Sequence, residues 1–149
     1  MRGRKAQIAV IGALAVAGCG SSEPAPLPAA CLDEAQIARV LMRVPAAVRL
    51  ADGTPLSRCV SRAARRDGDL QALGASLMRI ADDLHVAART DPRAAERLGY
   101  LIGSARRGAA RTPGIAAQLA RRLEQTASLD DALTRGALVL GIASGEETG

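Results

Sequence analysis

The chain contains almost no aromatic residues: Phe and Trp are absent, and Tyr100 is the only tyrosine. Proteins that bind single-stranded nucleic acid without sequence preference stack the bases on aromatic side chains. The composition gives no support for binding of that kind, and we expect no nucleic-acid partner. Histidine is equally scarce, since His85 is the only one in 149 residues.

The single histidine restricts the metal sites and the catalysis that this chain can support. Asp82 and His85 lie three residues apart, but a di-iron helical bundle needs a second acid–His pair, which is absent. A zinc site needs three or four ligands. Neither a Gly-x-Ser-x-Gly elbow nor a glycine-rich phosphate loop between a strand and a helix is present. We therefore expect no metal, no cofactor and no catalytic residues.

The chain begins with a basic and then apolar leader. Arg2, Arg4 and Lys5 precede an apolar run from Ile8 to Ala17. About ten apolar residues match the core of a signal peptide and are roughly half of what a membrane-spanning helix needs. The pattern predicts an export signal over residues 1–18.

The leader ends in Val16-Ala17-Gly18-Cys19, which resembles the lipobox of bacterial lipoproteins. The resemblance implies cleavage before Cys19 and a diacylglycerol thioether on its sulfur. At ~0.8 kcal/mol per buried CH₂, two or three acyl chains hold a protein firmly at a membrane. The implied place is extracytoplasmic: the outer membrane of a diderm bacterium, or the outer face of the plasma membrane of a monoderm. The alternative is an ordinary secretory signal cut after Ala17.

Residues 19–31 then form a lipidated N-terminus and a flexible Pro-rich linker in this interpretation. With Cys19 lipidated, Cys31 and Cys59 remain as an even pair outside the cytoplasm, where disulfides persist. We predict a bond between them. By the chain-entropy model such a bond contributes roughly 3.5 kcal/mol to stability, and that mechanism is model-dependent.

Beyond the leader, 17 arginines face 15 acidic residues, so the net charge of the mature chain is +2. Two groups of arginines contain no acid: a stripe of Arg58, Arg62, Arg65 and Arg66, and a cluster of Arg106, Arg107 and Arg111. Beside a membrane such groups can bind anionic headgroups at ~1 kcal/mol per residue. Phosphate-rich envelope polymers are a further target, and a solvated helix face is the alternative.

The remainder predicts an all-α domain of five or six short helices over residues 32–144, followed by a disordered tail, 145–149. Side-chain caps predict several of the helix starts: Asp33, Thr54-Pro55, Asp91-Pro92, Thr112-Pro113 and Ser128. The expected helices cover about 33–44, 55–66, 70–89, 91–107, 113–127 and 129–143. The first either ends at Pro45 or continues to Ala51.

Hydrophobic periodicity assigns faces to these helices. Residues 70–87 carry a heptad seam that indicates a bundle core or, alternatively, a dimer contact. Gly99 and Gly103 lie to one side of their helix, where a neighbour can approach closely. Residues 137–143 are apolar all round, which favours a central position in the core; an exposed docking surface is the alternative. Tyr100 falls on a polar helix side and marks either a partner contact or a helix edge.

These observations predict a membrane-anchored lipoprotein with a non-catalytic helical module. We expect the membrane to be engaged through the covalent lipid on Cys19. The module would bind another envelope component, either a protein or an anionic polymer. The alternative is a carrier of a small apolar ligand in its aliphatic core, and an enzyme of unknown type ranks third. The oligomeric state stays open.

Overall fold

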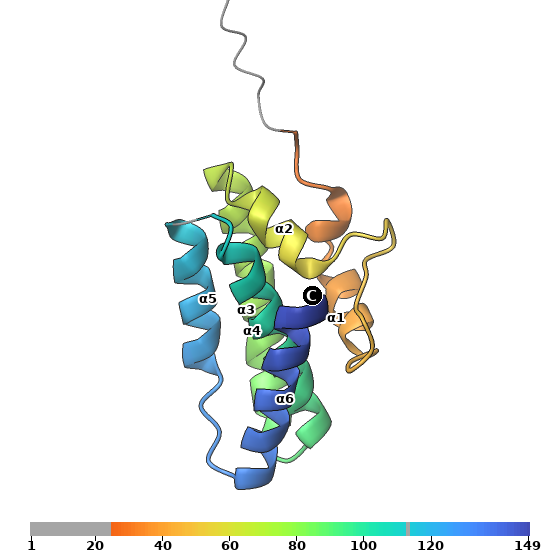
Figure 1. Cartoon of the computed structure of the whole chain (residues 1–149), viewed down its shortest axis with the longest axis vertical. Coiled ribbons are helices and arrows are strands. Elements are labelled where there is room, and N and C mark those ends of the chain that lie inside the picture. The colour runs from red at the N-terminus through yellow and green to blue at the C-terminus, as the bar shows by residue number, and fades with distance from the viewer. Residues whose placement is uncertain (1–24, 113) are drawn as a thin grey trace, which may run out of the picture.

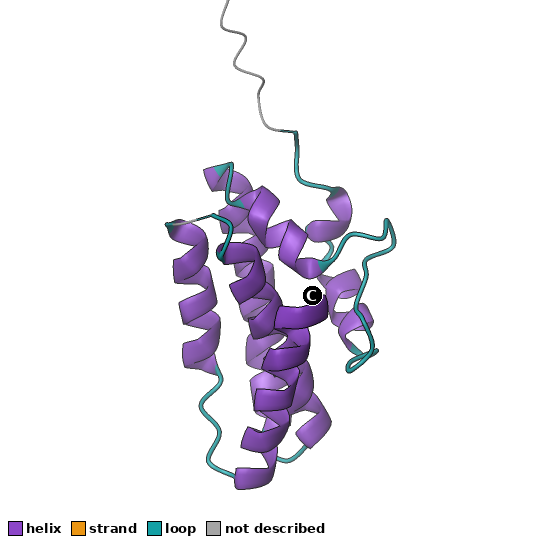
Figure 2. Ribbon diagram, viewed as in Figure 1, coloured by secondary structure: helices purple, strands orange, loops and turns teal. Residues whose placement is uncertain are grey.

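The computed structural model describes residues 25–112 and 114–149, so the predicted signal, Cys19 and Pro113 lie outside the described residues. In the described part, helices joined by loops are the only regular structure, and there is no strand (Figure 2). In chain order the elements are η1 (Ala29–Cys31), α1 (Glu34–Leu41), α2 (Leu56–Ala63), α3 (Asp67–Ala88), α4 (Pro92–Ala109), α5 (Ile115–Thr126) and α6 (Ala132–Thr148). The predicted all-α fold is confirmed.

Helix α4 lies at the centre of the bundle. Helices α2, α3, α5 and α6 all pack against it, whereas α1 lies mainly on α3 and η1. Figure 1 shows α2 crossing the end of the bundle at which the described chain begins, and α4 and α6 both run toward that end. Apolar residues at helical spacing along α4 are buried against the neighbouring helices: Ala94, Leu98, Leu101, Ile102 and Ala105.

Two predicted helix caps are confirmed. Asp33 accepts a hydrogen bond from the backbone N–H of Gln36, 2.9 Å away, and Asp91 accepts one from Arg93 at the same distance. At α6 the cap is Asp131 instead of Ser128, with 2.9 Å bonds from the N–H groups of Leu133 and Thr134. Each carboxylate satisfies N–H groups that have no partner within the first helical turn.

At α2 and α5 the predicted capping side chains are wrong, and the predicted start of α3 is too late. Pro55 is itself the N-cap of α2, without a side-chain cap, and Gly114 is the N-cap of α5, with a φ of 108° that favours glycine. The Thr112 hydroxyl donates backward to the carbonyl oxygen of Gly108. Helix α3 starts at Asp67, three residues before the predicted start, because acids in a first turn are favoured by the helix dipole.

The first helix ends before Pro45. Helix α1 stops at Leu41, and residues 47–50 belong to no helix, so the continuation to Ala51 does not occur. The Gln36 side chain accepts a 3.4 Å hydrogen bond from the N–H of Ala51. The segment after α1 therefore folds back beside the start of α1.

The contact between α4 and α6 is made by glycines. A Cβ atom added to Gly99 or Gly103 would overlap the carbonyl oxygens of Leu138 or Ile142 on α6. On α6, a Cβ atom at Gly141 would likewise overlap the carbonyl oxygen of Glu96. The two helices therefore meet backbone against backbone, and the predicted close approach at Gly99 and Gly103 is confirmed.

Helix α6 differs from its prediction in two ways. It continues to Thr148, so the predicted disordered tail 145–149 is wrong, because Gly145 packs against the backbone of Tyr100. Its apolar residues are also not central: Val139 is 62% exposed and Leu140 is 67% exposed. The buried side of α6 consists of Thr134, Gly141, Gly145 and one leucine, Leu138, whereas Val139 and Leu140 face outward.

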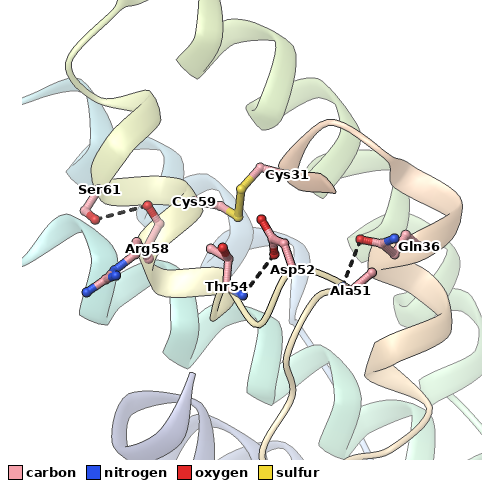
Figure 3. Close-up of a disulfide and its surroundings, with 8 residues drawn as sticks. All are labelled: Cys31, Gln36, Ala51, Asp52, Thr54, Arg58, Cys59 and Ser61. Carbon is pink, nitrogen blue, oxygen red and sulfur yellow. Dashed lines mark hydrogen bonds between the residues drawn. A yellow bond between two sulfur atoms is a disulfide. The ribbon is translucent and has the colours of Figure 1, made fainter. Parts of the chain in front are cut away.

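Cys31 and Cys59 form the predicted disulfide, with their Cα atoms 5.5 Å apart (Figure 3). The bond joins η1 to the middle of α2. Figure 3 shows Arg58 pointing away from the disulfide on the opposite side of α2. Within the residues that the structure describes, no helix combines the length and the apolar character needed to cross a membrane.

Candidate functional site

A polar pocket of about 430 Å³ lies where α2, the end of α4 and the end of α6 meet. Its lining includes four arginines, Arg49, Arg58, Arg107 and Arg111, and one acid, Glu147. Ser57 and Ser61 of α2 add hydroxyl groups. Of four cavities found among the described residues, this one has the most arginines in its lining, so we take it as the candidate functional site.

A close helix contact brings the two predicted arginine groups together at this pocket. The backbone of α4 at Gly108 approaches α2 so closely that an added Cβ would lie 2.5 Å from the carbonyl oxygen of Ser57 and 2.7 Å from Cβ of Val60. Arg58 on α2 therefore lines the same cavity as Arg107 and Arg111, which flank Gly108 in sequence. One member of the predicted stripe joins two members of the predicted cluster.

The last turn of α6 forms the third wall. The Ser57 hydroxyl donates a 2.6 Å hydrogen bond to the carbonyl oxygen of Gly149. Arg107 donates to the carbonyl oxygens of Glu146, at 3.0 Å, and of Glu147. Those carbonyls belong to the C-terminal end of a helix, where a cation is favoured. Arg107 thus holds α6 in place without losing its charge to a carboxylate.

The other pocket arginines have no acidic partner among the described residues. Arg49, Arg58 and Arg111 form no ion pair there, and Arg49 and Arg58 are exposed at the rim. Arg106 contrasts with them: it lies 2.7 Å from Glu124 and 3.1 Å from Glu146. The hydrogen bond that Arg106 donates to the carboxylate of Glu124 raises the pKa of Arg106 above its usual value. The charge of Arg106 is neutralised locally, and that of the pocket is not.

The predicted stripe on α2 is only partly continuous. Arg58, Arg62 and Arg65 are exposed, whereas Arg66 lies at the start of α3 with its guanidinium 3.7 Å from the carboxylate of Asp69. The stripe therefore consists of three exposed arginines, two on α2 and Arg65 in the turn that follows it. An arrangement of this kind can hold an anionic group in the pocket and attract a wider anionic surface around it.

The prediction that Tyr100 marks a surface contact is wrong. Its side chain is 0% exposed, and its hydroxyl accepts a 3.1 Å hydrogen bond from the N–H of Val48. The same hydroxyl lies 3.1 Å from the hydroxyl of Thr148 at the end of α6. Tyr100 is a core residue that ties α4 to α6 and to the segment before α2, because a buried phenol needs such partners.

Two further cavities are more apolar. One of about 510 Å³ lies between α3 and α5 along Leu70, Met78 and Leu119. Another of about 410 Å³ lies between α1 and α3, along Leu41 and Leu84. In the described ranges no three metal-binding side chains come together, and His85 lies half-buried with its Nδ1 atom unpaired.

Sequence reasoning missed Arg49, which enters the pocket from the segment before α2. The available signal was its position between the apolar Val48 and Leu50, both of which are buried while Arg49 is exposed. Such alternation is typical of an extended segment with one buried side. No family model matches the chain, and the comparisons with curated proteins and with solved structures find no match either.

Proposed function

We propose that this chain is a lipid-anchored extracytoplasmic protein whose helical domain binds an anionic component of the bacterial envelope without catalysing a reaction. The observation that carries the proposal is the pocket at which Arg49, Arg58 and Arg111 converge without acidic partners. Arginines that are not neutralised within the protein favour an external anion, because a guanidinium group forms paired hydrogen bonds with carboxylate or phosphate oxygens.

Two features support the extracytoplasmic placement. The lipobox-like segment ending at Cys19 is the sequence basis for the anchor. The Cys31–Cys59 disulfide is a bond that persists in oxidising compartments outside the cytoplasm. The two features are independent, since one concerns the leader and the other concerns the folded domain.

The anchor is tested by the mass of the exported product. Purified from membranes of a bacterial host, the mature chain should begin at Cys19 and carry two or three acyl chains. The Cys19→Ser chain should lack them and fail to partition with the membrane. An unmodified wild-type product that starts at another residue contradicts the anchor.

Binding is tested by charge reversal at the pocket. Envelope material crosslinked to the intact lipoprotein should be retained by the wild type and lost from Arg58→Glu combined with Arg111→Glu. Arg121→Glu combined with Arg122→Glu makes the same change in net charge on exposed positions of α5 and should retain the material. Equal loss from both double variants would mean that net charge alone attracts the material and that the pocket is not a site.

A carrier of a small apolar ligand remains the second candidate, because the cavity of about 510 Å³ between α3 and α5 has an apolar lining. Ile115 at its edge is 61% exposed, so this cavity opens at the surface. Native mass spectrometry of the purified protein should reveal a co-purifying ligand if this candidate is correct. A protein of the expected mass, free of ligand, counts against it.

A further inference from the structure

We infer that the anion held in the arginine pocket is the phosphate ester of an anionic phospholipid in the membrane that carries the anchor. This inference rests on the proposed function and names the ligand of the same site. The domain would then lie on the membrane that carries its lipid anchor, with α2 and the ends of α4 and α6 facing the bilayer.

The first argument is the short path between the anchor and the pocket. Five residues separate Cys19 from Ala25, the first described residue. An extended chain spans at most ~3.6 Å per residue, so Ala25 lies within about 22 Å of the lipidated sulfur. From there the chain soon reaches Cys31, whose Cα lies 5.5 Å from that of Cys59, the neighbour of Arg58. The disulfide therefore fixes the anchored end of the chain against α2, the helix whose opposite side carries Arg58.

The second argument is the orientation of the charges. The described chain begins at the end of the bundle that α2 crosses, and α4 and α6 both end toward it (Figure 1). Arg62 on α2 and Arg65 in the turn after it are both exposed. Basic residues within a Debye length of an anionic bilayer each contribute ~1 kcal/mol to its attraction. A membrane facing this end meets the pocket and the remaining stripe together.

The third argument is the chemistry of the lining. Guanidinium groups form bidentate hydrogen bonds with phosphate oxygens, and Ser61 adds a hydroxyl near the rim. The hydroxyl of Ser61 is bonded only to the carbonyl oxygen of Arg58, 3.2 Å away, which is one turn back on its own helix. The one acid in the lining, Glu147, opposes an anion, so its removal should strengthen binding.

The test measures how fast single arginines react with phenylglyoxal in the full lipidated protein, reconstituted into vesicles. In vesicles of phosphatidylglycerol, Arg58 and Arg111 should react about fivefold more slowly than in vesicles of phosphatidylcholine, which corresponds to ~1 kcal/mol per arginine. Arg121, which is exposed on α5, should react equally fast in both. Equal protection of Arg121 would show a general surface attraction and overturn the inference.

Two further arms separate the sources of phosphate and the two levels of the proposal. Protection by glycerol 3-phosphate in phosphatidylcholine vesicles, equal to that by phosphatidylglycerol, would assign a soluble phosphate ester and overturn the lipid assignment. In that case the crosslinking difference between the charge-reversal variants still stands, and with it the proposed function. If Arg58 and Arg111 are protected under none of these conditions, the phosphate assignment itself is overturned.

A gain-of-binding variant guards against loss of folding as an explanation. Glu147→Gln removes the opposing charge but keeps the backbone carbonyl to which Arg107 donates. In phosphatidylglycerol vesicles, Arg58 and Arg111 of this variant should react with phenylglyoxal more slowly than the same arginines of the wild type. Weaker protection in Glu147→Gln would contradict an anion in this pocket.

Discussion

Helices α5 and α6 both pack against α4, but they use different parts of the chain to do so. Helix α5 inserts side chains: Leu119 and Leu123 are buried, together with Ala116 and Ala120. Helix α6 places Gly141 and Gly145 against the backbone of α4 at Glu96 and Tyr100. The first contact depends on apolar burial, and the second depends on the absence of side chains.

This difference explains why the hydrophobic pattern predicts the buried side of α5 correctly but not that of α6. Leucines at the spacing of α5 indicate a buried side, and that side is buried. On α6 the buried positions are Thr134, Leu138, Gly141 and Gly145, while Leu133, Val139 and Leu140 are the exposed ones. Three of the large apolar residues of α6 therefore point away from the contact that holds it, so hydrophobicity alone wrongly places this stretch at the centre of the core.

The largest expected effect is that of a side chain placed in the glycine contact. Gly141→Leu should lower the free energy of unfolding by more than about 3 kcal/mol, because the carbonyl of Glu96 belongs to a helix backbone and cannot move aside. Chemical denaturation measures the loss. Gly136→Leu is the matched control on the same helix, where an added Cβ meets nothing within 4 Å, and it should not lower stability.

The corresponding change on α5 is the truncation of its innermost side chain. Leu123 is 0% exposed, so Leu123→Ala should lower the free energy of unfolding by about 2–3 kcal/mol through lost burial and the cavity left behind. The same denaturation experiment applies. A loss that exceeds that of Gly141→Leu would reverse the comparison between the two helices.

Tyr100 connects α4 to the end of α6 through its hydroxyl and should show a smaller effect. Tyr100→Phe removes the acceptor for the buried N–H of Val48 and the contact with Thr148, both 3.1 Å long. An unsatisfied buried N–H costs about 1–2 kcal/mol, which denaturation should detect. The segment around Val48 should also lose protection from hydrogen exchange. An unchanged exchange rate there would mean that the phenol does not hold this segment.

The start of α6 should respond to acid. Hydrogen bonds from the backbone N–H groups of Thr134 and Leu133 hold the pKa of Asp131 below its ordinary value of 3.8. A lowered pKa in the folded state means that the cap stabilises α6 above the ordinary pKa and that this contribution is lost as the pH falls through the folded value. Asp131→Asn keeps an oxygen acceptor but does not titrate. Its melting temperature should therefore fall less than that of the wild type between neutral pH and a pH below 3.8.

The smallest effect is a gain. Gly136 lies within α6 on its exposed side, with nothing near an added Cβ, and its φ is not positive. Gly136→Ala should raise the free energy of unfolding by about 0.5–1 kcal/mol, because alanine loses less backbone entropy in a helix. Gly141→Ala, by contrast, should lower it. If both substitutions changed stability in the same direction, glycine would act in α6 through helix propensity alone.

Much of the fold could be predicted from local patterns. The inward side of α4, the caps at Asp33 and Asp91, and the Cys31–Cys59 pair all follow from spacing within one segment or from cysteine counting. The caps predicted at Thr54 and Thr112 do not form, because Pro55 and Gly114 occupy the N-cap positions. The outward face of α6 depends on which neighbour it meets, and local pattern does not contain that information.

The candidate site was predictable only in parts. The sequence shows the stripe on α2 and the cluster at the end of α4 as two separate arginine groups. They meet at one pocket because the backbone of α4 at Gly108 packs closely against α2, a helix distant in sequence. Arg66 and Arg106 were indistinguishable from the others in sequence, and their pairing with Asp69 and Glu124 removes them from the site. Tertiary contacts decide which arginines stay unpaired.

The account depends on the backbone contact that holds the end of α6, because this end forms one wall of the arginine pocket. Native-state hydrogen exchange of the wild-type protein tests it directly. Amides of α6 from Gly141 to Thr148 should exchange only with global unfolding, at the same free energy as those of α4, while amides of α5 should open at a lower free energy. Exchange of α6 as fast as that of α5 would contradict the account.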